Sequence, residues 1–325
     1  MIISKTPLRI TIAGGGTDLP SFFNKHGGFV LSLAIDKYIY VTYNPNFFER
    51  DLKLRYSQIE IVKHARDLKN HRAKEMLLYH GVVDACEINT CADLPSNSGL
   101  GSSGSFLVGL SHVVRSYKGL SCDPRSLADD SCHVEIDRLQ EPVGKQDQYI
   151  AAFGGFKVFE ISQEGTVAVR VSIPVKRIEE LVSHIQLYYT NVRRDASDIL
   201  NDQRSLKGNS EELLLKIKDQ SYETLNILQS GNILDYGRML DDYWRLKKGL
   251  SNKISLREID SIYDTVKKKF DVLGGKIVGA GGGGFLLLFT EAPSEDNNLE
   301  AFMKESGYNR LVFKPEFNGS KACEF

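Results

Sequence analysis

Hydrophobic and polar positions alternate through most of the first hundred residues, a pattern typical of β-strands. Residues 9–13 alternate and then stop at three glycines, and residues 29–35 and 38–43 are rich in β-branched and aromatic side chains. The Asp36-Lys37 pair between the last two segments predicts a hairpin connection. We expect further strands at 52–56, 59–62 and 85–91, and a short helix at 71–80.

The next stretch has the spacing of helices. Residues 95–104 form a loop rich in Gly and Ser, and hydrophobic side chains recur at helical spacing from 106 to 114, so the loop starts a helix. A second helix is expected to begin near Pro124, with one apolar stripe that reaches Leu139. Two strands are then expected, at 156–161 and 167–173.

The sequence pattern changes around residues 174–183, where we place a boundary between two domains, 1–175 and 176–325. Beyond the boundary, a strand precedes long, charged amphipathic helices between about residues 195 and 270. Strands and helices in this mixed order predict an α+β fold rather than a regularly alternating parallel sheet. The later strands are expected at 184–190, 276–278 and 285–290, and a helix and a last strand end the chain.

Composition and charge narrow the class of protein. The 41 Lys+Arg residues nearly balance the 42 Asp+Glu residues, so a general nucleic-acid binder is disfavoured. With 42% hydrophobic and 26% charged residues, the chain is typical of a globular protein with a sizeable core. The most apolar stretch, 285–289, is too short to cross a membrane, and the N-terminus lacks a signal-peptide pattern. We therefore expect a soluble, cytoplasmic protein without nucleic-acid or membrane partners.

The cysteines give no sign of a disulfide framework or a structural zinc site. There are five, an odd number, and no two of them form a C-x-x-C pair. We expect reduced thiols in partly buried positions.

Two glycine-rich segments, 99–104 and 279–284, match the pattern G-x-G-x-x-G. Neither lies in an N-terminal βαβ unit with the acidic residue that a dinucleotide site needs, so a dinucleotide-dependent oxidoreductase is disfavoured. The first segment still suits an anion, because glycines allow close approach and the helix beginning near Ser102 and Ser103 offers free N–H groups. On composition alone, two simpler interpretations remain open. Residues 99–104 would then be only a tight loop before a helix, and residues 279–284 only a close-packed turn between strands.

Three motifs, in order along the chain, resemble those of the GHMP small-molecule kinases, which include galactokinase, homoserine kinase and mevalonate kinase. Residues 94–103 (LPSNSGLGSS) resemble the second motif, 5–10 (KTPLRI) the N-terminal substrate motif and 276–284 (KIVGAGGGG) the C-terminal glycine motif. The resemblance spans nearly the entire chain. It implies a two-domain α+β fold, with an N-terminal domain like the second domain of ribosomal protein S5, a ferredoxin-like C-terminal domain and an active site in the cleft.

The same resemblance implies ATP as co-substrate and Mg²⁺ as cofactor. The metal ligands that it implies are Ser103 and Glu135, which offer hard oxygen atoms to a Mg²⁺ that also binds phosphate. The nucleotide-binding residues that it implies are Pro95, Ser98, Gly99, Leu100, Gly101, Ser102, Ser103, Gly104, Gly281 and Gly282.

Two spacings are similar to those of kinases that act on the anomeric hydroxyl of a sugar. In galactokinases a sugar-binding Asp follows an N-terminal Arg by nine positions, as Asp18 follows Arg9. A Mg²⁺-binding Glu also precedes the catalytic Asp by twelve positions, as Glu135 precedes Asp147. Taken singly, these two acids would be interpreted as surface residues. The resemblance implies that Asp147 orients or deprotonates the anomeric hydroxyl, and that Arg9 keeps Asp147 ionised and balances charge at the transferred phosphoryl group.

The sugar-binding turn differs from that of galactokinases, which carry Gly-Glu-His-Thr-Asp-Tyr where this chain has GGGTDL at 14–19. Gly15 stands where the Glu that contacts the far end of the hexose would be, and Gly16 stands at the His position, so galactose is disfavoured. Loss of the acidic side chain leaves room for a longer, anionic sugar tail, and successive glycine N–H groups can form an anion-binding nest. The expected sugar-binding residues are Gly15, Gly16, Thr17 and Asp18.

Residues 6–10, 14–20 and 35–41 resemble the D-glycero-D-manno-heptose 7-phosphate kinases in particular. The resemblance implies phosphorylation of the 1-hydroxyl to the 1,7-bisphosphate, for nucleotide-heptose and surface polysaccharide biosynthesis. A 7-phosphate needs a cationic contact, for which Arg193 and Arg194 are the first candidates, with Lys5 and Lys145 after them, although a solvated helix start explains the two arginines equally well. A kinase for an unphosphorylated sugar such as fucose, an inactive sugar-sensing homologue and a homodimer all remain open.

Overall fold

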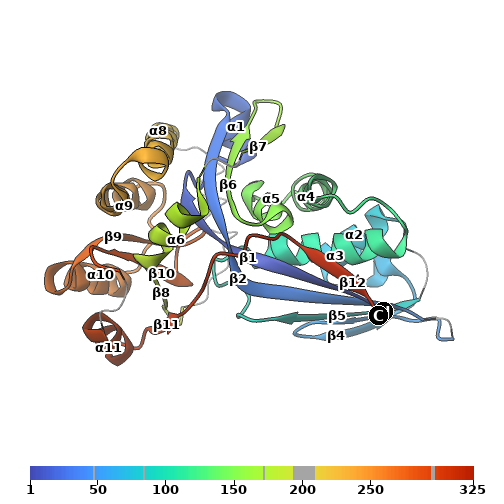
Figure 1. Ribbon diagram of the computed structural model, residues 1–325. Coiled ribbons are helices and arrows are strands. Elements are labelled where there is room, and N and C mark those ends of the chain that lie inside the picture. Colours follow the sequence, from blue (N-terminus) through green and yellow to red (C-terminus); the bar gives the residue numbers. More distant parts are fainter. Residues whose placement is uncertain (47, 83–84, 171–172, 193–208, 294–296) are drawn as a thin grey trace.

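Two sheets organise the chain, as the computed structural model shows for residues 1–46, 48–82, 85–170, 173–192, 209–293 and 297–325 (Figure 1). The first sheet is antiparallel except for the pairing of β3 with β5, and its long central strands β1 and β2 cross the molecule. Its strands are β1 (Ile2–Ala13), β2 (Gly28–Pro45), β3 (Leu52–Arg55), β4 (Ile59–Val62), β5 (Cys86–Ala92), β6 (Phe156–Ile161), β7 (Val167–Arg170) and β12 (Lys321–Glu324).

The predicted hairpin at Asp36-Lys37 is wrong, because both residues lie inside the continuous strand β2. Against β1, the register passes from Pro7 opposite Tyr38 to Leu8 opposite Ile35, so Asp36 and Lys37 bulge out of the ladder. Pro7 has no N–H to donate at this point. The bulge is instead bonded to a distant segment, since the Asp36 amide donates to the Lys314 carbonyl oxygen at 2.9 Å.

Helices cover one face of the first sheet, with α3 along its centre (Figure 1). The apolar side chains that predicted α3 face the sheet, and Leu107, Leu110, Val113 and Val114 are fully buried. The helix expected from Pro124 is α-helical only to Cys132 and continues as the π-helical segment η2 (His133–Arg138). The helices of this unit are α1 (Pro20–His26), α2 (His71–Tyr79), α3 (Ser102–Tyr117), α4 (Pro124–Cys132) and α5 (Gln146–Phe153), with a short 3₁₀ turn, η1 (Ala65–Asp67).

The second sheet has the order β11-β8-β10-β9, and all of its pairings are antiparallel. Every residue of β10 is buried, as the apolar run at this position predicted. Strand β9 begins four residues earlier than expected. The sequence pattern missed these residues because Gly274 and Gly275 are unusual within a strand. Glycine is needed at 274 because α9 packs closely there, and a Cβ would lie 2.2 Å from the Gly237 carbonyl oxygen. The strands are β8 (Ile185–Tyr189), β9 (Val272–Ile277), β10 (Phe285–Thr290) and β11 (Asn309–Leu311), and the helices are α6 (Val175–Ser183), α8 (Ser210–Ser230), α9 (Ile233–Lys248), α10 (Arg257–Lys269) and α11 (Asn297–Glu305).

The chain returns to the first sheet at its end, where β12 pairs with the beginning of β1. The two ends therefore lie side by side in Figure 1, and the Met1 amino group donates to the Phe325 carbonyl oxygen at 3.0 Å. A boundary after residue 175 separates the strands of the two sheets except for β12. The predicted α+β class is confirmed.

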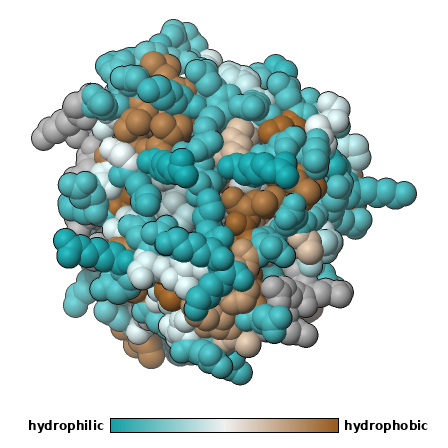
Figure 2. Space-filling model, turned by 90° about the vertical axis from the view of Figure 1, so that its left-hand side faces the viewer, coloured by the Kyte–Doolittle hydropathy of each residue, from teal (hydrophilic) through white to brown (hydrophobic). Residues whose placement is uncertain are grey.

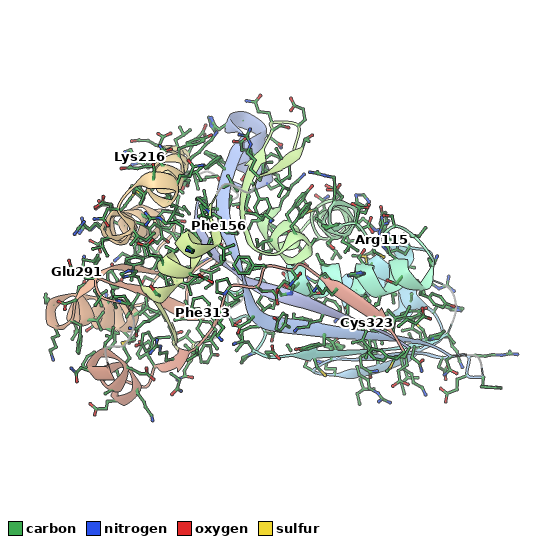
Figure 3. All side chains as sticks on the ribbon, in the orientation of Figure 1. Arg115, Phe156, Lys216, Glu291, Phe313 and Cys323 are labelled. Atoms are coloured by element: carbon green, nitrogen blue, oxygen red, sulfur yellow. The ribbon has the colours of Figure 1, made fainter. Side chains whose placement is uncertain are left out.

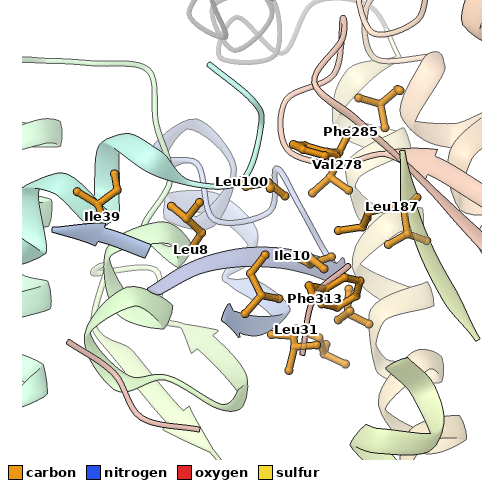
Figure 4. Packing of buried hydrophobic residues seen from close by; sticks show 14 of the residues in the cluster. Leu8, Ile10, Leu31, Ile39, Leu100, Leu187, Val278, Phe285 and Phe313 are labelled. Atoms are coloured by element: carbon orange, nitrogen blue, oxygen red, sulfur yellow. The ribbon is translucent and has the colours of Figure 1, made fainter. Parts of the chain in front are cut away.

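One hydrophobic cluster continues from the first unit into the second. Leu8, Ile10 and Leu31 of the first sheet and Leu100 of the loop before α3 belong to it. Leu187, Val278 and Phe285 of the second unit, which Figure 4 also labels, belong to the same cluster. Phe313, on the returning segment, lies near the middle of the molecule (Figure 3). The interface between the two units is therefore well packed. Such packing favours a fixed position of the residues of one unit relative to those of the other.

The outer face of the second unit is mainly hydrophilic, with hydrophobic side chains in groups that polar side chains interrupt (Figure 2). Within the part of the chain that the structure describes, no helix is both long enough and apolar enough to cross a membrane.

Candidate active site

A cleft of about 570 Å³ opens between the two units, and it collects side chains that are far apart in the sequence. Its walls come from the end of β1, the turn before α1, the start of α3, the segment from η2 to α5, and from α9 and β9. The predicted site residues that line it are Arg9, Gly15, Gly16, Asp18, Gly99, Gly101, Ser102, Ser103, Glu135 and Asp147.

Arg9 and Asp147 form a bidentate ion pair in the cleft. Arg9 Nε donates to Asp147 Oδ1 at 2.6 Å, and Arg9 Nη2 donates to Oδ2 at 2.8 Å. The third nitrogen of the guanidinium, Nη1, donates to the Gly99 carbonyl oxygen at 2.6 Å. Arg9 is 5% exposed, and Asp147 lies in the first turn of α5, where the helix dipole favours a carboxylate. The pair thus fixes the orientation of the Asp147 carboxyl group, whose remaining lone pairs keep acceptor capacity toward the cleft.

The loop before α3 approaches this pair closely because it carries glycines. Gly101, the residue before the helix, has a φ of 79°, and a Cβ there would lie 3.0 Å from Arg9 Cγ. A Cβ on Gly104 would lie 2.8 Å from the Cβ of Asp147. No side chain caps this end of α3, and Ser102 and Ser103 face the cleft. The first N–H groups of α3 therefore form a suitable site for a phosphate group.

The second glycine run packs directly against the first loop. A Cβ on Gly279 would lie 2.5 Å from the Gly99 carbonyl oxygen, and a Cβ on Gly284 would lie 2.3 Å from that of Ser98. Gly279 and Ala280 line the cleft. Gly281 and Gly282 do not, since they contact Ile254 and the Gly282 amide donates to the Ile254 carbonyl oxygen at 2.7 Å. The geometry therefore favours Gly279 and Ala280 as the residues of this run that face a ligand.

Several other predicted residues support the cleft from behind. The Thr17 hydroxyl is buried and donates to the Gly14 carbonyl oxygen at 2.8 Å, so it fixes the turn. Leu100 is part of the hydrophobic core. The Ser98 hydroxyl is buried without a partner among the described residues. Pro95, Ser98, Leu100, Gly104 and Thr17 do not line the cleft.

Asp18 is held at the cleft by main-chain donors. Its side chain accepts from the Gln146 amide at 3.1 Å and from the Gly16 amide at 3.2 Å. Burial raises the pKa of Asp18, and the nearby charge of Asp147 raises it further. Because the Gly16 N–H is used in this way, the expected anion-binding nest at the glycines has one donor fewer than the sequence indicated. The carboxylate remains an acceptor for a ligand hydroxyl.

Glu135 is fully buried and has two donors on its carboxylate. Arg72 Nε donates to Oε1 at 3.0 Å, and Gln148 Nε2 donates to Oε2 at 2.6 Å. Arg72 also pairs with Glu141. Burial lowers the pKa of Arg72, but the two carboxylates outweigh it and raise that pKa overall. Arg72 was not predicted, because it lies on α2 outside every motif.

The residues around Glu135 fit a Mg²⁺ ion that is shared with a nucleotide. No group of three or more His, Cys, Asp or Glu side chains among the described residues could hold a metal by itself. One carboxylate and one hydroxyl, from Glu135 and Ser103, nevertheless suit Mg²⁺, which takes its other ligands from phosphate and water. Gln148 Oε1 is buried at the cleft without a donor from the described residues, so it can accept from a water on the ion.

Two buried lysines and a tyrosine line the opposite part of the cleft, and sequence reasoning missed all three. Lys276 Nζ donates to the Ile12 carbonyl oxygen at 2.7 Å and lies 4.5 Å from the centre of the Tyr243 ring. Lys247 Nζ donates to the Ile277 carbonyl oxygen at 3.0 Å. Burial, assisted by the charge of Arg9, lowers the pKa of Lys247 to about 7. Lys276 opens the third motif, which was the one signal available.

The four basic residues suggested for a sugar phosphate are absent from the described wall of the cleft. Arg193 and Arg194 lie outside the described residues. Lys5 Nζ lies 3.8 Å from the centre of the Tyr38 ring, and Lys145 donates to the Gly165 carbonyl oxygen. Neither lysine lines the cleft. The cationic residues that do line it are Arg9, Arg72, Lys247 and Lys276.

Two family models match the chain, one in each unit. The model of the GHMP kinases N terminal domain matches residues 59–155, and the model of the GHMP kinases C terminal matches residues 225–309. Together they cover more than half of the 325 residues.

Individual relatives agree with the two family models. The chain is 29% identical to the D-glycero-alpha-D-manno-heptose 7-phosphate kinase of Campylobacter jejuni, over 94% of both chains. It is 25% identical to the L-fucokinase/L-fucose-1-P guanylyltransferase of Bacteroides fragilis, over 95% of this chain but 36% of that one. The crystal structure of a D-glycero-D-manno-heptose 1-phosphate kinase from Bacteroides thetaiotaomicron superposes with a TM-score of 0.81 at 22% identity, over 100% of this chain and 99% of that one.

Proposed function

This chain belongs to the GHMP kinase family of phosphotransferases, and from that premise we propose that it phosphorylates the anomeric 1-hydroxyl of D-glycero-D-manno-heptose 7-phosphate with ATP. The products are the 1,7-bisphosphate and ADP, and the bisphosphate would serve nucleotide-heptose and surface polysaccharide biosynthesis. The 29% identical relative from Campylobacter jejuni supports this substrate. The bidentate pair of Arg9 and Asp147 beside the start of α3 is the observation that carries the proposal.

The acceptor hydroxyl is activated at Asp147. Its carboxylate is held by two Arg9 nitrogens, so its remaining lone pairs can accept the proton of the 1-hydroxyl. The sugar oxygen then forms a bond to the γ-phosphorus while the bond from that phosphorus to the β-γ bridging oxygen breaks, and ADP leaves. Asp18, with its acceptor side chain fixed by two amides, would bind ring hydroxyls and set the orientation of the sugar.

The negative charge of the transferred phosphoryl group is balanced by donors and cations of the protein. Phosphoryl transfer passes through a loose transition state, so catalysis consists mainly of positioning and of stabilising charge. The N–H groups at the start of α3 and the guanidinium of Arg9 are placed for this purpose. Bound Mg²⁺, held by Glu135 and Ser103, would neutralise the phosphate oxygens.

The absence of a side chain at Gly15 supports a substrate that is longer than a hexose. A Cβ there would already lie 3.4 Å from the Tyr243 hydroxyl oxygen, so a larger side chain at this position would have to displace Tyr243 or project into the cleft. With glycine, no side chain of the turn occupies this part of the cleft.

A coupled kinase assay tests the proposal over a panel of heptose 7-phosphate, free heptose, galactose, mannose and fucose. We expect the highest kcat/KM with heptose 7-phosphate, and NMR should identify carbon 1 as the new phosphorylation site. Phosphate on another carbon would refute the assignment.

The fucose alternative is supported by the match to the Bacteroides fragilis protein. Faster turnover of fucose than of the heptose in the same panel would favour it. An inactive sugar-sensing homologue is disfavoured, because Asp147, Arg9 and Glu135 all line the cleft. ATP consumption with any sugar would exclude that interpretation.

A further inference from the structure

Lys247 and Lys276 are buried at the cleft with neutral partners only. Lys247 is 5% exposed and Lys276 is 1% exposed. Within the described residues, neither ammonium group meets a carboxylate: Lys276 has the Ile12 carbonyl oxygen and the face of Tyr243, and Lys247 has the carbonyl oxygens of Ile277 and Gly279. Buried ammonium groups are usually paired with acids, because burial removes their hydration. This pair is an exception that calls for an anion.

The surroundings of the two lysines increase the need for a negative partner. They interact repulsively with each other and with Arg9, whose own charge is already matched by Asp147. Burial lowers the pKa of Lys276 well below its usual value, and the charges of Lys247 and Arg9 lower it further. A dianionic phosphate group placed between these cations would reverse both effects.

The contacts of Lys276 place it beside the sugar-binding turn. It is bonded to Ile12, two residues before the glycine turn that carries Asp18, and it touches Tyr243, which faces Gly15. The residues expected to bind the nucleotide and its metal lie on other elements. Glu135 lies on η2, where Arg72 donates to its carboxylate, and Ser102 and Ser103 lie at the start of α3. Lys276 thus lies on the wall next to the sugar-binding turn, and Lys247 lies beside it and bonds to the Gly279 carbonyl oxygen.

We propose that Lys247 and Lys276 bind the phosphate group of the phosphorylated sugar substrate, on the wall that α9 and β9 contribute to the cleft. This assignment rests on the proposed function and gives the sugar phosphate a binding site within the described residues. The Lys276 ammonium group lies 4.5 Å from the centre of the Tyr243 ring, which also lines the cleft. The chemistry recognised is a phosphate monoester, and the alternative source of such a group in the same cleft is the nucleotide.

Calorimetric binding, without turnover, tests the site with two ligands, heptose 7-phosphate and ADP. The variants are Lys276→Met and Lys247→Met, which keep side-chain length but remove the charge. Lys218→Met is the matched control, because Lys218 is also a partly buried lysine that donates to a main-chain carbonyl, that of His26, outside the cleft. We expect both cleft variants to bind heptose 7-phosphate at least about tenfold more weakly, to bind ADP as the wild type does, and the control to bind both normally.

Each other outcome contradicts a stated part of the proposal. Weaker binding of ADP with unchanged binding of the sugar phosphate would assign the lysines to the nucleotide, and unchanged binding of both ligands would remove the site. Tight binding of the sugar phosphate by a wild-type protein that phosphorylates no sugar would refute the proposed function and leave the site. Equal kcat/KM for free and phosphorylated heptose would refute the site and leave the kinase.

A thermal melt separates binding from a structural role. Removal of a buried, unpaired charge should leave the Tm unchanged or raise it, whereas lysines that only support the fold would lower the Tm on substitution and weaken both ligands alike. Lys276→Arg keeps the charge and should retain more of the sugar-phosphate affinity than Lys276→Met.

Discussion

Arg72 Nε lies 3.0 Å from Oε1 of Glu135, so a guanidinium of this chain holds the carboxylate that we expect to bind Mg²⁺. Glu135 is fully buried, and without a cation it would carry an uncompensated charge. Arg72 therefore supplies the positive charge in the protein alone. A Mg²⁺ ion held by Glu135 would supply positive charge at the same carboxylate and would compete with Arg72 for it.

The first prediction is that Arg72→Met makes stability dependent on Mg²⁺. Loss of the guanidinium should lower the free energy of unfolding by about 2–3 kcal/mol, because a buried carboxylate loses a charged donor. Millimolar MgCl₂ should restore most of this loss in the variant and change the wild type little, as measured by thermal or urea unfolding.

Arg138→Met is the control for that experiment. Arg138 is also on the η2 side of the cleft but pairs with Glu75 at the surface, 2.7 Å away, so its loss should cost less than about 1 kcal/mol. Equal stabilisation of the Arg72 variant and the wild type by Mg²⁺ would contradict the exchange of Arg72 for the metal.

The second prediction concerns the acid that receives the proton. Asp147→Asn keeps the shape of the side chain but removes its basicity, so kcat should fall at least about 100-fold while the KM for ATP changes little. Asp137→Asn is the control, since Asp137 is an exposed acid in the same part of the chain whose carboxylate pairs with His133, at 2.9 Å, outside the cleft. Near-normal kcat in Asp147→Asn, measured with the coupled assay, would eliminate the general-base role.

The third prediction uses two glycines with the same backbone conformation. Gly101 has a φ of +79° and Gly119 a φ of +64°, so alanine at either position should cost about 1–2 kcal/mol of stability. Only at Gly101 would the new Cβ also press on Arg9, at 3.0 Å, and on Asp147, at 3.3 Å; Gly119 has open space around it. Urea unfolding should show at least this loss for both variants, with the larger loss for Gly101→Ala because of the added contacts, and kinetics should show a fall in kcat for Gly101→Ala alone.

Parts of the site could be predicted because they follow from short stretches of sequence. The glycines before α3 and the spacing of Glu135 from Asp147 are local patterns, and the structure places all of them at one cleft. The periodicity of residues 106–114 likewise gave α3, because a helix with one buried face leaves that pattern in the sequence.

The rest depends on contacts between distant segments. Lys247 lies in a charged helix and looks like a surface residue, yet α9 packs against β9 and buries it. Asp36-Lys37 looks like a turn, but the returning segment at Lys314 bonds to it and keeps β2 continuous. Thr17 looked like a ligand contact, but its hydroxyl is used internally, by the Gly14 carbonyl oxygen and by the main chain of Phe29 on β2. No local pattern reports such neighbours.

The last prediction is a pH dependence that originates in Lys247. Burial, assisted by the charge of Arg9, lowers the pKa of Lys247 to about 7, so the ammonium group loses its proton as pH rises through about 7. A sugar phosphate gains its second negative charge as pH rises through about 6. The kcat/KM for heptose 7-phosphate should therefore rise to a maximum between these values and fall on the alkaline side.

Variants and substrates identify the group responsible for the alkaline fall. In Lys247→Met the fall should be absent and the maximal kcat/KM lower, whereas Lys247→Arg should keep the charge and extend activity to higher pH, because a guanidinium stays protonated. Free heptose, which has no phosphate to bind, should show no fall near pH 7 even with the wild type. If the fall persists in Lys247→Met, it belongs to another group, and the buried lysine does not meet the phosphate.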